Sequence, residues 1–272
     1  MMTPRIERLR EQSLNAVHCI SAERGLLMTQ YYREVADPAD SVPVQRARAF
    51  SHLLENKSIC INPGELIVGE RGPAPKATPT YPEINLHSLE DLDILHNRKK
   101  VSFRVDEETR RAFREEIIPF WKGRTNRDRI FAQLDESWKN AYEAGVFTEF
   151  QEQRAPGHTV LGDKIYRKGM NDLIGEIELQ LAERESGNDP STGGKLEELK
   201  AMRIAAHALI RYAERHAGVL ERLAGQEKEE SRKAEMLQMA YICRRVPANA
   251  PRTLHEALQY YWFVHLGVIT EL

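Results

Sequence analysis

Residues 197–223, EELKAMRIAAHALIRYAERHAGVLERL, form the stretch that decides the fold class of this 272-residue chain. Apolar or small residues recur in it at alternating intervals of three and four positions, with Glu, Lys and Arg between them. This spacing places them on one stripe of a long α-helix. The stripe consists of Leu199, Met202, Ala206, Leu209, Ala213, His216, Leu220 and Leu223. We predict that it is a packing seam, in which His216 is a structural side chain and not a ligand.

A second helix is predicted at 227–243, after Gly225, a residue type that commonly follows the end of a helix. Its apolar side consists of Met236, Met239, Ala240 and Cys243. The connection that precedes the long helix is also recognisable. The run from Ser186 to Gly194 is rich in Ser, Gly, Asn and Pro, which favours an exposed turn between two helices.

The C-terminal segment 254–268 is the most hydrophobic part of the sequence, so we expect it to be buried. Thr253 and Glu256 have the spacing of a capping box, in which each side chain caps a backbone amide at the start of a helix. The sequence ends at Leu272, directly after this segment. A domain seldom ends on its most core-like element, which leads us to expect a truncated chain.

Strand patterns are few. Residues 59–61 and 65–69 are apolar and flank the turn Asn62-Pro-Gly64, which predicts a short hairpin-like element. Residues 72–87 contain four prolines, which exclude regular structure, yet their aromatic and aliphatic residues argue against a solvated linker. We expect a long ordered loop against a core, and such loops often carry function.

Composition excludes several classes of protein. The chain is 41% hydrophobic with a net charge of -2, has no basic run, and has few, scattered aromatic residues, so we expect no nucleic-acid partner. No apolar window reaches the length of a membrane helix, and no secretory signal opens the sequence. Three widely spaced cysteines, Cys19, Cys60 and Cys243, favour a reducing compartment. These features predict a cytoplasmic protein with no membrane association.

Common catalytic and cofactor motifs are absent from the sequence: it has no CxxC, HExxH, GxGxxG, GxxxxGK[ST] or GxSxG. One unusual segment remains, 147–159, FTEFQEQRAPGHT. Its Pro-Gly turn directs His158 away from the flanking elements, Arg154 has the planar fork that binds carboxylates, and Phe150 offers an aromatic face to a compact substrate. The alternative interpretation is a helix end whose Arg and Glu side chains cap loop carbonyls and amides, and composition alone slightly favours it.

Several motifs in the same order resemble the N-terminal region of glycyl radical enzymes, the pyruvate formate-lyase-like superfamily. They are INPGELIVG at 61–69, PTYPE at 79–83, HNR at 96–98, EIIPFW at 116–121, the segment 147–158 and YWFVH at 261–265. Within the superfamily, the trans-4-hydroxy-L-proline dehydratase subgroup is the most similar. The resemblance extends over essentially the whole chain, which we treat as one unit, 1–272.

The resemblance implies a mainly helical N-terminal part of a ten-stranded α/β barrel, with few short strands in this chain. It implies a C–O lyase of anaerobic metabolism that removes water from hydroxyproline to give a pyrroline carboxylate. The implied cofactor is a glycyl radical, installed by an S-adenosylmethionine-dependent activating enzyme, which is the implied protein partner; the resemblance also allows a homodimer. Phe150 and His158 match residues that line the substrate pocket of the subgroup, and Arg154 is our own addition as a supporting residue.

The reactive cysteine and the radical glycine of the family lie in its later portion, and none of the three cysteines here occupies the cysteine motif. The resemblance therefore assigns no catalytic residue, bound cofactor or metal ligand to this chain, which we expect to be inactive alone. Two alternatives stay open. One is another glycyl radical enzyme, either a glycerol or diol dehydratase or a pyruvate formate-lyase-like acetyltransferase. The other is a non-catalytic helical subunit.

Overall fold

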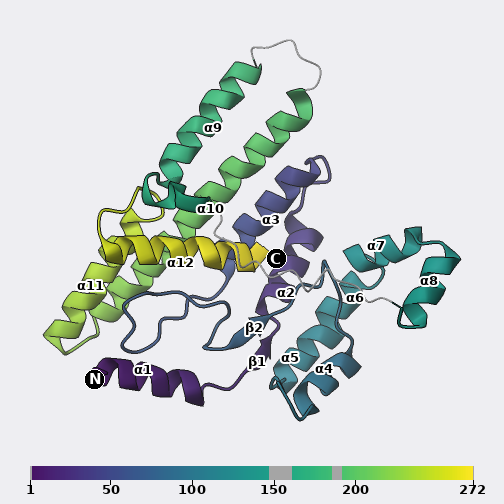
Figure 1. The fold of residues 1–272 in the computed structure, drawn as a ribbon, viewed down its shortest axis with the longest axis horizontal. Helices are drawn as coiled ribbons and strands as arrows, with labels where there is room; N and C mark the ends of the chain where they lie inside the picture. The colour runs from purple at the N-terminus through teal and green to yellow at the C-terminus, as the bar shows by residue number, and fades with distance from the viewer. Residues whose placement is uncertain (1, 147–160, 186–191, 272) are drawn as a thin grey trace.

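A computed structural model describes residues 2–146, 161–185 and 192–271. The molecule is mainly α-helical, with two short strands among the described residues, which confirms the mainly helical character predicted for it (Figure 1). None of the described helices is long and apolar enough to span a membrane.

The C-terminal half is built on the long helix that the sequence predicted. This helix, α10 (Thr192–Ala224), runs beside α9 (Met170–Glu185) and packs against α3 (Val42–Asn56) and α11 (Glu230–Arg245). The last helix, α12 (Leu254–Glu271), crosses them and contacts α3, α10 and α11 (Figure 1). Because Gly225 follows the last residue of α10, the predicted helix stop is confirmed.

The connection predicted at 186–194 is shorter than expected. Its last three residues, 192–194, belong to the first turn of α10, and residues 186–191 lie outside the described part of the chain.

The predicted capping box of α12 is present in a modified form. Thr253 Oγ1 accepts from the Glu256 amide at 3.2 Å, but the Glu256 carboxylate accepts from the Arg252 amide at 2.6 Å instead of from Thr253.

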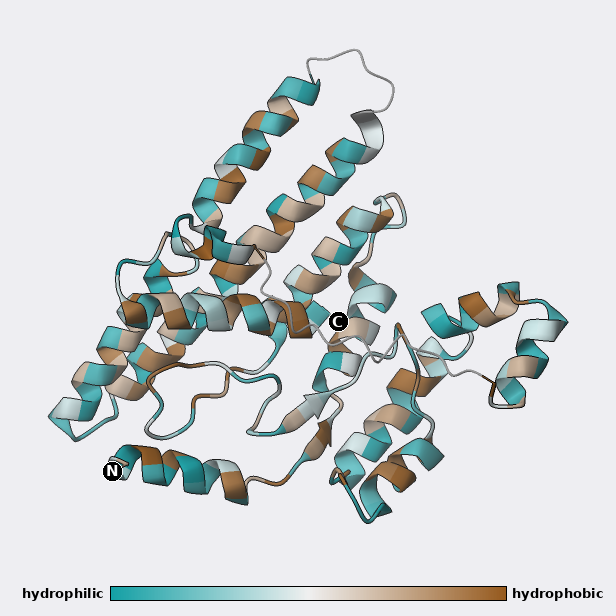
Figure 2. Cartoon of the chain, viewed as in Figure 1, coloured by the Kyte–Doolittle hydropathy of each residue, from teal (hydrophilic) through white to brown (hydrophobic). Residues whose placement is uncertain are grey.

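The predicted stripe of α10 is right at its centre and wrong at one end. Ala206, Ala213 and Leu220 are buried as expected, whereas Met202 is 54% exposed. Tyr212 and Ala217 lie off the stripe and are fully buried. Because α3, α9 and α11 all pack against α10, its buried face is wider than one stripe. Brown and teal residues alternate along α9 and α10 in Figure 2, as expected for helices with one apolar and one polar face.

The hydrophobic helix α12 is only partly buried, which corrects the expectation for 254–268. Tyr260, Phe263 and Leu266 are fully buried, but Leu254 is 76% exposed and Leu258 is 48% exposed. One face of α12 packs on the helices beneath it, and these two side chains lie on the other face.

The N-terminal half packs around a second core. It contains β1 (Cys19–Ser21), which pairs in parallel with β2 (Ala77–Pro79) in the register Cys19 to Ala77. The helical elements of this half are α1 (Pro4–Asn15), α2 (Glu23–Gln30), the π-helical η1 (Tyr31–Val35), α4 (Leu89–Asn97), α5 (Glu107–Ala112), the π-helical η2 (Phe113–Ile117), α6 (Ile118–Trp121), α7 (Asn126–Gln133) and α8 (Glu136–Glu143). Strand β2 interrupts the loop 72–87, which the prolines led us to expect without regular structure.

The hairpin predicted at 59–69 is wrong, because neither apolar run forms a strand. The backbone of this segment bonds instead to side chains on one face of α12. His255 Nε2 bonds the Leu66 carbonyl at 2.6 Å, and Trp262 Nε1 donates to the Gly69 carbonyl at 2.8 Å. Between them, Gln259 bonds both the amide and the carbonyl of Val68, at 2.8 and 2.9 Å. The helix therefore satisfies the backbone groups that a partner strand would otherwise satisfy.

Candidate functional site

The three residues that the sequence singled out, Phe150, Arg154 and His158, lie in 147–160, outside the described residues. Their described neighbours belong to different parts of the fold. Val146 follows α8 in the N-terminal half and is 75% exposed. Leu161 precedes the short 3-10 helix η3 (Gly162–Tyr166), which contacts α12 in the C-terminal half.

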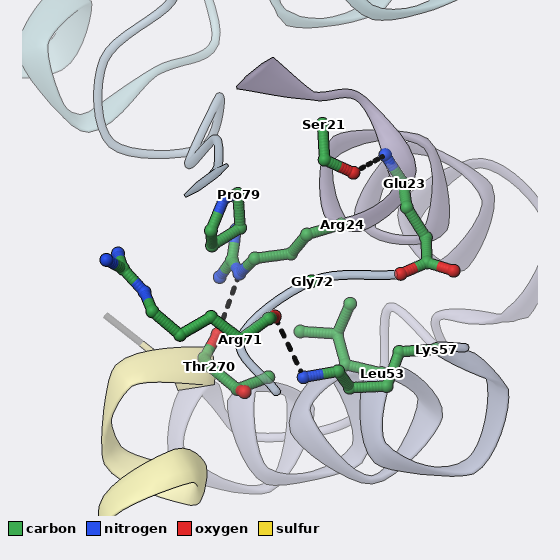
Figure 3. A pocket seen from close by; sticks show the side chains of 9 residues that line it. All are labelled: Ser21, Glu23, Arg24, Leu53, Lys57, Arg71, Gly72, Pro79 and Thr270. Carbon is green, nitrogen blue, oxygen red and sulfur yellow. Dashed lines mark hydrogen bonds between the residues drawn. The ribbon is translucent and has the colours of Figure 1, made fainter. Parts of the chain in front are cut away.

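The structure instead brings together a set of charged residues that the sequence analysis did not identify. They surround a small pocket between β1, α2, α3, the loop 70–79 and the end of α12 (Figure 3). The residues that line this pocket are Ser21, Glu23, Arg24, Leu53, Lys57, Arg71, Gly72, Pro79 and Thr270. It has room for little more than a single water molecule, so it is part of the packing around these charges and not a substrate pocket.

Arg24 lies at the centre of this cluster and is 5% exposed. Its guanidinium makes two hydrogen bonds to the carboxylate of Glu83, at 2.5 and 3.1 Å, and stacks on the Tyr81 ring at 4.1 Å. It also donates to the carbonyl oxygens of Thr270 at 2.7 Å, Thr80 at 3.1 Å and Glu271 at 3.3 Å. These five bonds use every N–H that an arginine side chain has, so the buried charge is both paired and fully hydrogen-bonded.

Lys57 is the second buried cation of the cluster. Its Nζ donates to the carbonyls of Arg71 at 3.0 Å and Glu70 at 3.3 Å, and lies 5.3 Å from the centre of the Tyr212 ring. Burial lowers the pKa of Lys57 to about 8. Its own carbonyl accepts from Arg215 at 2.7 Å. Lys57 thus fixes the start of the proline-rich loop against α3 and α10, which is a structural role.

His216 was predicted to be structural, and its surroundings agree with this. The fully buried ring donates from Nδ1 to the Tyr212 carbonyl at 2.9 Å and lies 5.1 Å from the Phe263 ring. Its Nε2 has no partner among the described residues. Burial lowers the pKa of His216 to about 4, because a charge on this ring would be unsolvated. No group of three or more possible metal ligands occurs in the described part of the chain.

This environment makes stability pH-dependent. The pKa of His216 is lower in the folded protein than its ordinary value of 6.5, so the unfolded chain binds more protons between pH 6.5 and pH 4. Acidification through this window is expected to cost up to about 1.4 kcal/mol per pH unit, or about 3 kcal/mol in total. Urea unfolding of wild type and His216→Leu between pH 6.5 and pH 4 measures this contribution of His216 to the free energy of unfolding. The stability difference between the two proteins should shrink or reverse towards pH 4; a constant difference would contradict the assignment.

The three cysteines of this chain have pKa values above the ordinary value of a thiol. Burial raises the pKa of Cys243 to about 12 and that of Cys60 to about 11, and it also raises the pKa of Cys19. All three are free thiols. Since a nucleophilic thiol needs a lowered pKa, these surroundings activate none of the three as a nucleophile.

A sequence model of the pyruvate formate lyase-like family matches residues 2–272. The chain belongs to this family. It is 49% identical over 268 residues to trans-4-hydroxy-L-proline dehydratase of Clostridioides difficile, covering 98% of this chain and 34% of that protein. The crystal structure of that dehydratase, with trans-4-hydroxy-L-proline bound, matches with a TM-score of 0.93 at 48% identity, over 100% of this chain and 34% of that one.

Two other solved structures of similar proteins agree with this assignment. The B12-independent glycerol dehydratase of Clostridium butyricum matches with a TM-score of 0.91 at 30% identity, over 100% of this chain and 34% of that one. A glycyl radical enzyme of Archaeoglobus fulgidus matches with a TM-score of 0.86 at 32% identity, over 97% and 34% of the two chains. This pyruvate formate lyase-like chain therefore spans about a third of the length of these relatives.

Sequence reasoning missed Arg24, Lys57 and Glu271 because these residues are far apart in the chain and belong to no local motif. The available signal was the loop PTYPE at 79–83, which the resemblance included. Three of its residues, Thr80, Tyr81 and Glu83, are direct partners of Arg24.

Proposed function

We propose that this chain forms the N-terminal third of a glycyl radical C–O lyase that removes water from trans-4-hydroxy-L-proline to give a pyrroline carboxylate. The observation that carries the proposal is the TM-score of 0.93 at 48% identity to the hydroxyproline dehydratase structure. In this proposal residues 1–272 are one unit of a larger catalytic domain, the ten-stranded barrel of the family.

The glycyl radical supplies the hydrogen-atom chemistry of such an enzyme, and an S-adenosylmethionine-dependent activating enzyme is the proposed partner that installs it. We assign none of the three cysteines of this chain a role in that chemistry. What the chain contributes is the scaffold and the segment 147–160. Within it we assign Phe150 to packing against the proline ring, His158 to the polar network around the substrate, and Arg154 to support of that network. The 272-residue polypeptide alone is expected to have no lyase activity.

A glycerol or diol dehydratase is the second candidate. It is supported by the match to the glycerol dehydratase structure, at the lower identity of 30%. Assaying the activated full-length polypeptide with trans-4-hydroxy-L-proline and with glycerol separates the two. Turnover of hydroxyproline supports the first proposal, and turnover of glycerol alone supports the second. Absence of turnover, with the radical present, would favour a different family activity, such as an acetyltransferase, or a non-catalytic role.

Substitution of the assigned residues tests the site. In the full-length polypeptide, Phe150→Ala and His158→Ala are each expected to lower kcat/KM for hydroxyproline at least about tenfold, the effect of losing one good contact worth about 1.4 kcal/mol. Radical content, measured by electron paramagnetic resonance, should stay at the wild-type level. Val146→Ala, at an exposed position next to the segment, is the matched control. Unchanged kinetics in both variants would remove these residues from the site.

A further inference from the structure

The carboxyl end of α12 is held by side chains from segments at the other end of the chain. The last carbonyls of an α-helix have no partner within the helix and carry partial negative charge. Here the Thr270 and Glu271 carbonyls accept from Arg24, at 2.7 and 3.3 Å, and the Ile269 carbonyl accepts from the Tyr81 hydroxyl. Three consecutive carbonyls are thus satisfied by residues nearly 190 or more positions away.

A second arginine extends this arrangement to the last helical side chain. Arg46, on α3, bonds the Glu271 carboxylate at 2.5 Å. Arg24, on α2, is fixed in turn by the two bonds to Glu83. Figure 3 shows the Arg24 side chain crossing the pocket between Pro79 and Thr270 to reach the helix end. We call Arg24, Arg46, Tyr81 and Glu83 the α12 socket.

The socket is built for one geometry. A planar guanidinium donates in five fixed directions, and all five directions of Arg24 are used by two segments, residues 80–83 and the end of α12. Because Arg24 itself belongs to α2, its side chain joins three separate parts of the chain. A lysine at this position would keep the charge but has three donors and no fork. Arg24 therefore fixes the carboxyl end of α12 relative to α2 and to residues 80–83.

We propose that Arg24 is a positioning residue, which through the α12 socket sets the direction of the chain after α12 and thereby the geometry of the catalytic domain; this role in catalysis rests on the proposed function. The residue does not touch substrate. It acts through the backbone of Thr270 and Glu271, at the carboxyl end of α12.

The first test is local and does not depend on the proposed activity. In the full-length polypeptide, Arg24→Lys is expected to increase amide hydrogen exchange in the peptide that covers 267–271 at least about tenfold, with exchange in 212–220 of α10 unchanged. Arg33→Lys, which alters an exposed ion pair to Glu116 at 2.7 Å, is the charge-matched control. Exchange equal to that of the control, or raised equally in α10, would overturn the positioning role.

The second test concerns catalysis. In the activated enzyme, Arg24→Lys should lower kcat at least about tenfold and change KM less than about threefold. The reason is that a small misalignment of the reacting groups slows the chemical step more than it weakens substrate binding. Wild-type kcat in Arg24→Lys would overturn the link to catalysis. If the wild-type enzyme does not act on hydroxyproline, the proposed function has failed, and the exchange experiment still decides the positioning role.

Discussion

Replacing Gly169 with alanine is expected to lower the free energy of unfolding by about 3–5 kcal/mol, from overpacking and the loss of two hydrogen bonds. A Cβ at this position would lie 2.3 Å from the Ala248 carbonyl oxygen and 2.4 Å from the Asn249 Cα. These are backbone atoms, so no side chain can move aside. To relieve the clash, the start of α9 must leave the loop, which breaks the bonds from Met170 to Pro247 at 2.8 Å and from Asn171 to Ala248 at 3.0 Å.

Gly175 provides the matched control for this prediction. It lies in the middle of α9, where an added Cβ meets nothing within 4 Å. Gly175→Ala is expected to raise stability by about 0.5–1 kcal/mol, because alanine loses less backbone entropy in a helix. Urea unfolding of both variants measures the difference. Two variants of equal stability would show that the contact between α9 and the loop 247–249 is not as close as the structure has it.

The second large effect is expected at Gln259. Gln259→Leu leaves the Val68 amide and carbonyl without partners, although Val68 is fully buried and Gln259 is 1% exposed. Each buried group left unsatisfied costs about 1–3 kcal/mol, so the unfolding free energy should fall by about 2–6 kcal/mol. Limited proteolysis should also cut the segment 59–70 faster, because α12 no longer holds its backbone.

An exposed glutamine gives the reference for this variant. Gln238 lies on the solvent side of α11, and Gln238→Leu should change stability by no more than about 0.5 kcal/mol. If the two leucine variants unfold at the same urea concentration, the two hydrogen bonds between Gln259 and the Val68 backbone contribute nothing to the stability of the protein. Protection of the segment 59–70 would then have to come from its apolar contacts alone.

The helices could be predicted from the sequence because their signals are local. The spacing of apolar residues located α10 to within five residues at its start and one at its end, and glycine after Ala224 marked its stop. The strands could not be predicted in this way. Cys19–Ser21 and Ala77–Pro79 are three residues long and pair across more than fifty positions, so neither segment has a pattern of its own.

The hairpin predicted at 59–69 shows the limit of such patterns. Apolar residues flanking Asn-Pro-Gly are compatible with two paired strands and equally with a loop whose backbone bonds to a helix. The choice depends on His255, Gln259 and Trp262, which are spaced to lie on one face of α12 but are nearly 190 residues or more away in sequence. Their spacing along α12 predicts no hydrogen-bond partner until the position of α12 relative to the loop is known.

The candidate site divides in the same way. The composition of 147–159 and the resemblance pointed to Phe150 and His158, to which we added Arg154, and the roles of all three stay proposals, since they lie outside the described residues. The α12 socket came only from the tertiary structure, because its members are far apart in the sequence and no local pattern connects Arg24 and Arg46 with Tyr81 and Glu83. From the sequence alone, Arg24 and Glu83 would be assigned to the surface, as most charged residues are.

The sequence by itself determined the helical class, the approximate boundaries of α10, α11 and α12, and membership of the family, since periodicity, caps and ordered motifs are properties of short segments. Only the tertiary structure decided which carbonyls Arg24 satisfies, why Lys57 can be buried, and why 59–69 is not a strand. A buried polar group is stable only when its partners are in place, and here those partners come from distant parts of the chain.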